Sequence, residues 1–111
     1  MFPLDDPNKI DLVTHSQKTN ELVVVMTETR PWGSDGTLVL SLQAKLKNYV
    51  AFVESGELAR RYPGHEAAGV CVRLSTKHPL GDIELSFLEK AQEMWLGPLG
   101  MRLEVSRPDT P

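Results

Sequence analysis

The chain has 111 residues, of which 41% are hydrophobic and 24% charged, so it can form one domain with a packed core. Twelve Lys and Arg residues against fifteen Asp and Glu residues leave a net charge of −3 with no basic block, which excludes non-specific nucleic-acid binding through a cationic face. The one cysteine, Cys71, cannot form an internal disulfide, and no stretch approaches the roughly 18 apolar residues of a membrane span. We therefore expect a cytoplasmic protein with neither a membrane nor a nucleic-acid partner.

The first predicted elements are two strands. Residues 10–15 and residues 21–28 are both rich in β-branched side chains. The short polar linker between them is typical of an antiparallel hairpin, with His15 near its turn. The N-terminal residues lack the basic and apolar regions of a signal peptide.

The spacing of apolar residues predicts a helix over residues 38–53. Its apolar stripe consists of Leu38, Val39, Leu42, Leu46, Tyr49, Val50 and Val53. Outside the stripe fall the polar residues Lys45, Lys47, Asn48 and Glu54. Ser34 or Asp35 is expected to cap the start of the helix, Gly56 is suited to its end, and residues 57–62 could add one more turn.

The second half repeats the order of strand and helix. Residues 69–75 predict a third strand, and residues 77–82 form a turn that opens a second helix. The apolar side of this helix consists of Ile83, Phe87, Leu88, Ala91, Met94 and Trp95. Residues 97–100 end the helix, and the alternating residues 101–105 predict a last strand.

The order β-β-α-β-α-β predicts a two-layer α+β fold in which a four-stranded mixed sheet carries two helices on one face. We expect one domain over residues 10–105, an irregular lead-in over residues 1–9 and a polar tail over residues 106–111. Two strand orders, 1-2-3-4 and 1-2-4-3, satisfy the crossover rule, and the pattern does not choose between them.

The second strand is apolar on both of its faces, which is expected of a strand that is covered on both sides. If Leu12 faces the helices, then Asp11, Val13 and His15 point away from them. Two helices on one face leave the other face open, so we expect a homodimer that forms through this open sheet face.

A candidate site lies where the second and third strands end. Ligands of open sheets bind beyond the carboxyl ends of parallel strands, at the N-termini of the helices. The residues expected to gather there are Asp11, Glu28, Arg30, Trp32, Ser34, Asp35, Lys77 and His78. An arginine fork, an indole plane and helix N–H groups can together hold a small anion, and a protein partner is an alternative ligand.

Two other interpretations stand beside this one. The first is structural: Arg30 pairs with Glu28, Trp32 packs onto the start of the helix, and Ser34 and Asp35 only cap it. The second is a small enzyme that uses His78 as its acid and base together with Asp11, Glu28 and Arg30. An immunity or antitoxin-like protein also fits the size and the acidic balance, although no particular residue points to it.

Metal and cofactor chemistry has no motif in the chain. His15, His65 and His78 stand on separate elements without the spacing of metal ligands, and Cys71 lies in the middle of a predicted strand. Neither a phosphate-binding loop nor a nucleophile elbow occurs. We therefore expect no cofactor and no metal, and the sequence favours a binding domain over an enzyme without deciding between them.

Four segments, residues 10–15, 25–32, 69–74 and 102–105, resemble those of a small bacterial family of single-domain proteins of unknown function. Its most distinctive feature is an Arg-Pro-Trp element followed by Ser-Asp, which here is Arg30, Pro31 and Trp32 followed by Ser34 and Asp35. The resemblance covers about residues 8–105 and implies a bacterial source and an α+β domain. It implies no activity, cofactor or catalytic residue.

Overall fold

The computed structural model describes residues 12–33, 36–64 and 69–106. One four-stranded sheet runs through the molecule in the order β1-β2-β3-β4. It consists of β1 (Leu12–Ser16), β2 (Glu21–Glu28), β3 (Gly69–Thr76) and β4 (Met101–Ser106). β1 is antiparallel to β2, whereas β2, β3 and β4 are parallel. The predicted α+β fold is confirmed, and of the two open strand orders the chain adopts 1-2-3-4.

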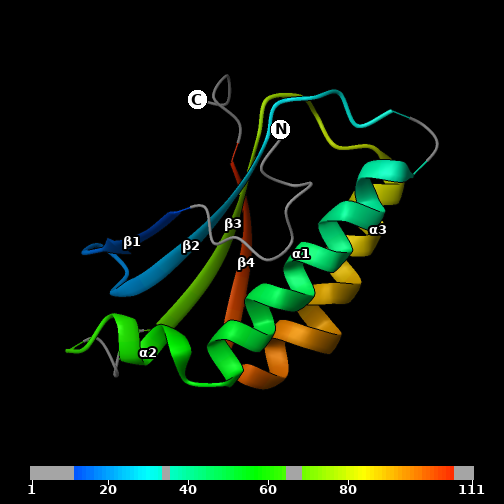
Figure 1. The fold of residues 1–111 in the computed structure, drawn as a ribbon. Coiled ribbons are helices and arrows are strands. Elements are labelled where there is room, and N and C mark those ends of the chain that lie inside the picture. Colours follow the sequence, from blue (N-terminus) through cyan, green and yellow to red (C-terminus); the bar gives the residue numbers. More distant parts are fainter. Residues whose placement is uncertain (1–11, 34–35, 65–68, 107–111) are drawn as a thin grey trace.

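The helical layer covers one face of the sheet, with α1 and α3 side by side (Figure 1). It consists of α1 (Thr37–Glu54), the short α2 (Glu57–Arg61) and α3 (Asp82–Ala91), followed by a π-helical turn η2 (Gln92–Leu96) and a 3-10 turn η3 (Gly97–Leu99). The predicted extra turn after the first helix is α2. No helix among the described residues combines the length and apolar character needed to cross a membrane.

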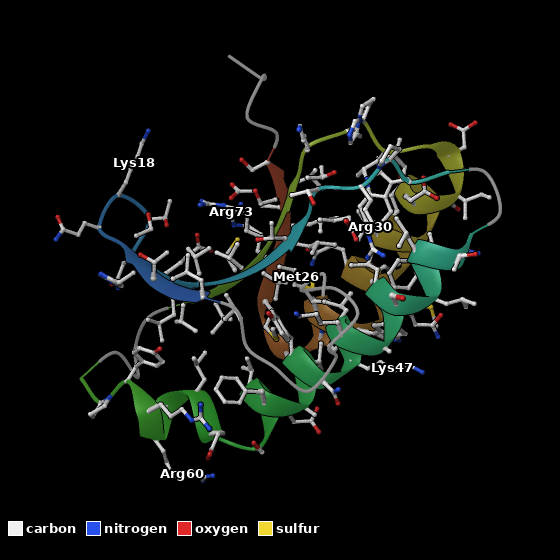
Figure 2. All side chains as sticks on the ribbon, turned by 45° about the horizontal axis from the view of Figure 1, so that its top comes forward. Lys18, Met26, Arg30, Lys47, Arg60 and Arg73 are labelled. Carbon is white, nitrogen blue, oxygen red and sulfur yellow. The ribbon has the colours of Figure 1, made fainter. Side chains whose placement is uncertain are left out.

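The core fills the space between the sheet and α1. Figure 2 shows Met26 of β2 in this space, where it is fully buried. Leu42 and Leu46 of α1 belong to the same apolar cluster, as does Leu88 of α3. The Tyr49 hydroxyl donates a hydrogen bond to the Val25 carbonyl at 3.0 Å, which ties α1 directly to the backbone of β2.

The start of α1 differs from the prediction of a Ser34 or Asp35 cap. The helix begins at Thr37, and its N-cap residue is Gly36 with φ 75° and no side-chain cap. A left-handed backbone angle of this kind is readily adopted by glycine, so the chain enters the helix through a sharp glycine turn. Ser34 and Asp35 themselves lie outside the described residues.

Lys45 was expected on the polar side of α1, but it is completely buried. The position lies three residues after Leu42 and four before Tyr49, so its stem follows the apolar stripe. Its ammonium group lies 5.9 Å from the centre of the Tyr49 ring. The four methylene groups of the side chain are apolar, and the face of the Tyr49 ring offers the ammonium group a cation–π contact.

The apolar side predicted for the second helix is only partly buried. Leu88 and Ala91 face the core, whereas Ile83 is 51% and Met94 67% exposed. The sheet covers only the middle of the stripe, so residues at its flank remain in contact with water. Of the six residues predicted on the apolar side of this helix, Ile83 and Met94 are therefore exposed to solvent.

The outer face of the sheet, away from the helices, is buried at its centre. Val23, Val25 and Cys71 are buried as a second small cluster. The two faces of β1 are reversed relative to the arrangement considered in the sequence analysis. Val13 packs against the main core, and Leu12 is 56% exposed. The apolar side chains of β2 on this face are therefore buried within the single chain, Leu12 of β1 is exposed beside them, and the homodimer stays a prediction.

Ion pairs cross this outer face. Arg102 donates to Glu21 at 2.6 Å and Arg73 donates to Glu104 at 2.6 Å. Figure 2 shows Arg73 on the side of the sheet away from the helices. These hydrogen bonds lower the pKa values of the Glu21 and Glu104 carboxyl groups, and burial raises the pKa of the Cys71 thiol.

The free edge of β4 is occupied by a side chain of the π-helical turn. The Gln92 amide donates to the Met101 carbonyl at 3.1 Å and accepts from the Leu103 N–H at 2.7 Å. These two backbone groups point away from β3, so the glutamine takes the place that a further strand would use.

Candidate functional site

The loops that follow β2 and β3 meet at one edge of the sheet, as their parallel direction predicts. The Lys77 N–H donates to the Glu28 carbonyl at 3.0 Å. This bond extends the pairing of the two strands by one step beyond their ends. The described residues of the two loops therefore lie next to each other at this edge, as the sequence predicted.

Glu28 and Arg30 form a closed ion pair at this edge. The Arg30 guanidinium approaches both carboxylate oxygens of Glu28, at 2.6 Å from Nη2 and at 3.0 and 3.1 Å from Nε. The Arg30 backbone N–H adds a fourth contact at 2.8 Å. Glu28 is completely buried, whereas the Arg30 side chain is 25% exposed. The carboxylate is thus saturated by its own loop and is not available as a general base.

Trp32 fastens the same loop to β3. Its ring is buried, and the indole N–H donates to the Thr76 hydroxyl at 3.0 Å. That hydroxyl donates in turn to the His78 carbonyl at 2.8 Å. The chain of bonds supports the structural interpretation of Trp32 as a plug, because every polar group in it already has a partner within the fold.

The other predicted site residues contribute less. The His78 side chain is half-buried and makes no hydrogen bond with the described residues. Asp11, Ser34 and Asp35 lie outside the described residues. Within those residues, no cluster of three His, Cys, Asp or Glu side chains is arranged to hold a metal ion. In the part of this edge that the structure describes, hydrogen bonds connect the loops that follow β2 and β3.

A second candidate site lies in the helical layer, at the end away from the loops that follow β2 and β3. An open hollow of about 360 Å³ separates the C-terminal half of α1 from the turns after α3. Its lining consists of Lys47, Val50, Glu54, Met94, Trp95, Pro98 and Leu99. Met94 is 67% and Leu99 41% exposed, so large apolar surface borders the hollow. Figure 2 shows Lys47 extending from α1 away from the sheet.

A further hollow continues along α3. Its lining consists of Asp82, Ile83, Ser86, Phe87 and Lys90. The Phe87 and Trp95 rings meet edge to face with their centres 5.7 Å apart, so the two hollows adjoin at this pair. We call the twelve residues that line the two hollows the helix seam.

Charges are placed in order along the helix seam. Asp82 lies at the start of α3 and Glu54 at the end of α1. The two lysines of the helix seam, Lys47 and Lys90, lie between them along the direction of the helices. Lys47 places its ammonium group 5.5 Å from the centre of the Trp95 ring. Neither lysine forms an ion pair with a carboxylate of the described chain.

Comparison with known proteins gives a family and no activity. A model of a family of unknown function, DUF6572, matches residues 2–109. The chain belongs to this family. Neither a curated protein nor a solved structure matches it. Membership of DUF6572 therefore covers both candidate sites and assigns a function to neither.

Sequence reasoning missed the helix seam in this DUF6572 member. Met94 and Trp95 were assigned to the same apolar side as the other four residues because the spacing of a regular helix places them there. The π-helical turn adds one residue to the last turn and changes their direction. A signal was nevertheless present, because the apolar residues of the second helix cover a wider arc than one sheet face can bury.

Proposed function

We propose that this domain is a non-enzymatic binding domain and that the helix seam is its binding surface. The observation that supports this most directly is the exposure of Ile83, Met94 and Leu99 along the two hollows, which are lined by Phe87 and Trp95. Contiguous apolar surface with a polar border is typical of interaction sites, whereas single exposed apolar residues are not.

An enzyme at the sheet edge has less support. In that hypothesis His78 acts as acid and base together with the Glu28 carboxylate. Both oxygens of Glu28 already accept hydrogen bonds from Arg30. No described carboxylate orients the His78 ring by a hydrogen bond. A proton carrier without an orienting partner and without a free neighbouring base lacks the arrangement that general acid and base catalysis uses.

The predicted small-anion site at Arg30 is a secondary proposal. Glu28 neutralises much of the guanidinium charge, so we expect weak binding at most. Inorganic phosphate titrated into labelled protein tests it. Saturable shifts of the Arg30 and His78 amides would support the site, and shifts only at exposed lysines would contradict it.

The predicted homodimer is a proposal of its own, and native mass spectrometry over a range of concentrations tests it. Arg73→Glu perturbs the outer sheet face, whereas Met94→Glu perturbs the helix seam. A dimer that only Arg73→Glu disrupts would support the sheet face. A protein that is monomeric at every concentration would contradict the dimer.

Site-specific photo-crosslinking tests the binding function. A photoreactive residue in place of Met94 is expected to capture one partner in cells of the source organism, because it lies in the helix seam. A matched control places the same residue at Leu12, which is also exposed but lies on β1. Leu99→Lys should abolish capture from position 94. Equal capture from both positions would contradict the proposal.

A further inference from the structure

The lysines of the helix seam define the kind of partner that it accepts. We propose, on the basis of the proposed binding function, that the helix seam binds an amphipathic helix of another protein. The partner helix has an apolar stripe, with carboxylates beside the middle of the stripe and cations beside both of its ends. The inference names a partner class that the binding function alone does not require.

The shape of the helix seam supports a helical occupant. Two helices, α1 and α3, lie side by side (Figure 1). One hollow lies between α1 and the turns after α3 and the other lies along α3, so together they extend from Asp82 to Leu99. A third helix laid along such a groove places side chains at spacings of three and four into it. The exposed Met94 supplies a flexible apolar surface that adapts to the incoming side chains.

The charge order supports the middle position of the carboxylates. Lys47 and Lys90 occupy the central part, and each lacks a carboxylate partner among the described residues. Lys47 lies over the Trp95 ring, where an incoming carboxylate can meet it next to an apolar surface. An ion pair at such a partly dehydrated place contributes more than one in open water.

The ends of the helix seam require the opposite charge. Glu54 is exposed and lies seven residues after Lys47 on α1, a rise of about 10 Å along the helix. Asp82 is exposed at the other end, at the first residue of α3. A partner helix with cations at both ends and carboxylates between them matches this order.

A second copy of the chain does not fit the same pattern. A two-fold axis centred on the helix seam would place its central lysines against those of the other copy. The acidic ends would likewise meet acidic ends. Because like charges face each other across such an interface, we assign the helix seam to a different protein.

Two blocked peptides of identical composition test the inference. Each has about 18 residues, the length of α1, and the same Leu and Trp stripe. The first carries two Glu in the middle and one Lys at each end, and the second exchanges these positions. Binding is followed by shifts of the Val50 and Leu99 amides and of the Trp95 indole N–H in labelled protein.

We expect the first peptide to bind at least about tenfold more tightly than the second, a difference that salt should reduce. In the Lys47→Glu/Lys90→Glu variant the preference should reverse, and both lysines are exposed, so this variant should fold. Equal binding of both peptides at the helix seam would overturn the charge inference and leave the binding function standing. Failure of both peptides to shift these signals would count against both.

Discussion

Arg30→Gln tests whether the ion pair between Glu28 and Arg30 at the sheet edge stabilises the fold. The substitution removes the three guanidinium contacts to Glu28 and keeps the backbone N–H contact at 2.8 Å. Removing one partner of a fully buried ion pair costs about 3–5 kcal/mol. Because the Arg30 side chain is 25% exposed and one hydrogen bond remains, we expect a loss of about 2–3 kcal/mol.

Urea-induced unfolding measures this loss directly. In thermal unfolding it corresponds to a decrease in melting temperature of about 10–20 °C for a domain of this size. The matched control is Arg73→Gln, because Arg73 and its partner Glu104 are 37% and 33% exposed. Solvent screens that pair, so we expect a loss of about 0.2–1 kcal/mol.

The double variant Glu28→Gln/Arg30→Gln separates the charge from the contacts. Without a buried charge to compensate, it is expected to recover most of the stability that Arg30→Gln loses. If Arg30→Gln cost no more than Arg73→Gln, the fold would not depend on the ion pair. Such a result would support the predicted anion site at Arg30.

Three further predictions concern the sheet. Gln92→Ala opens the β4 edge and should increase self-association in light scattering relative to Gln17→Ala in the β1–β2 turn; equal behaviour of the two variants would contradict this role. Arg102→Ala removes the donor that lowers the pKa of the Glu21 carboxyl below 4.5. A carboxyl group whose pKa is lowered in the folded protein stabilises the fold at pH values above its ordinary pKa, and this stability is lost as the pH falls through the lowered pKa. The variant should therefore lose less stability than wild type in urea unfolding below about pH 4.5. An equal loss of stability with falling pH in both proteins would refute the linkage. Burial raises the pKa of the Cys71 thiol, so a thiol reagent should label it only in urea, and rapid labelling of the native protein would contradict its position in the sheet.

The sequence predicted the elements well where one physical signal dominates. The unbroken apolar run of β2 and the strict spacing of α1 each have one good solution, and both elements formed where expected. The meeting of the two loops followed from parallel strand direction alone. The facing of β1 did not follow, because Leu12 and Val13 are both apolar, and only pairing with β2 decides which of them turns inward.

The candidate site was less predictable for two reasons. At the sheet edge, residue type does not distinguish an arginine that waits for a ligand from one that already binds a buried glutamate. At the helix seam, the decisive feature is the π-helical turn, which no propensity or spacing in the sequence indicates. Both depend on tertiary geometry, and the exposed positions of Met94 and Leu99 follow from it.

The π-helical turn links the two ways in which this fold could associate with other chains. A sheet of this kind can recruit a partner through the backbone of an edge strand or through side chains on a helical surface. The first residue of the turn, Gln92, occupies the β4 backbone, and the third and fourth, Met94 and Trp95, border the helix seam. One short segment therefore occupies the strand edge, where pairing would be insensitive to sequence, and also contributes side chains to the proposed binding surface. This division is what a specific binding domain requires, because selectivity needs the wrong association to be prevented as well as the right one to be favoured.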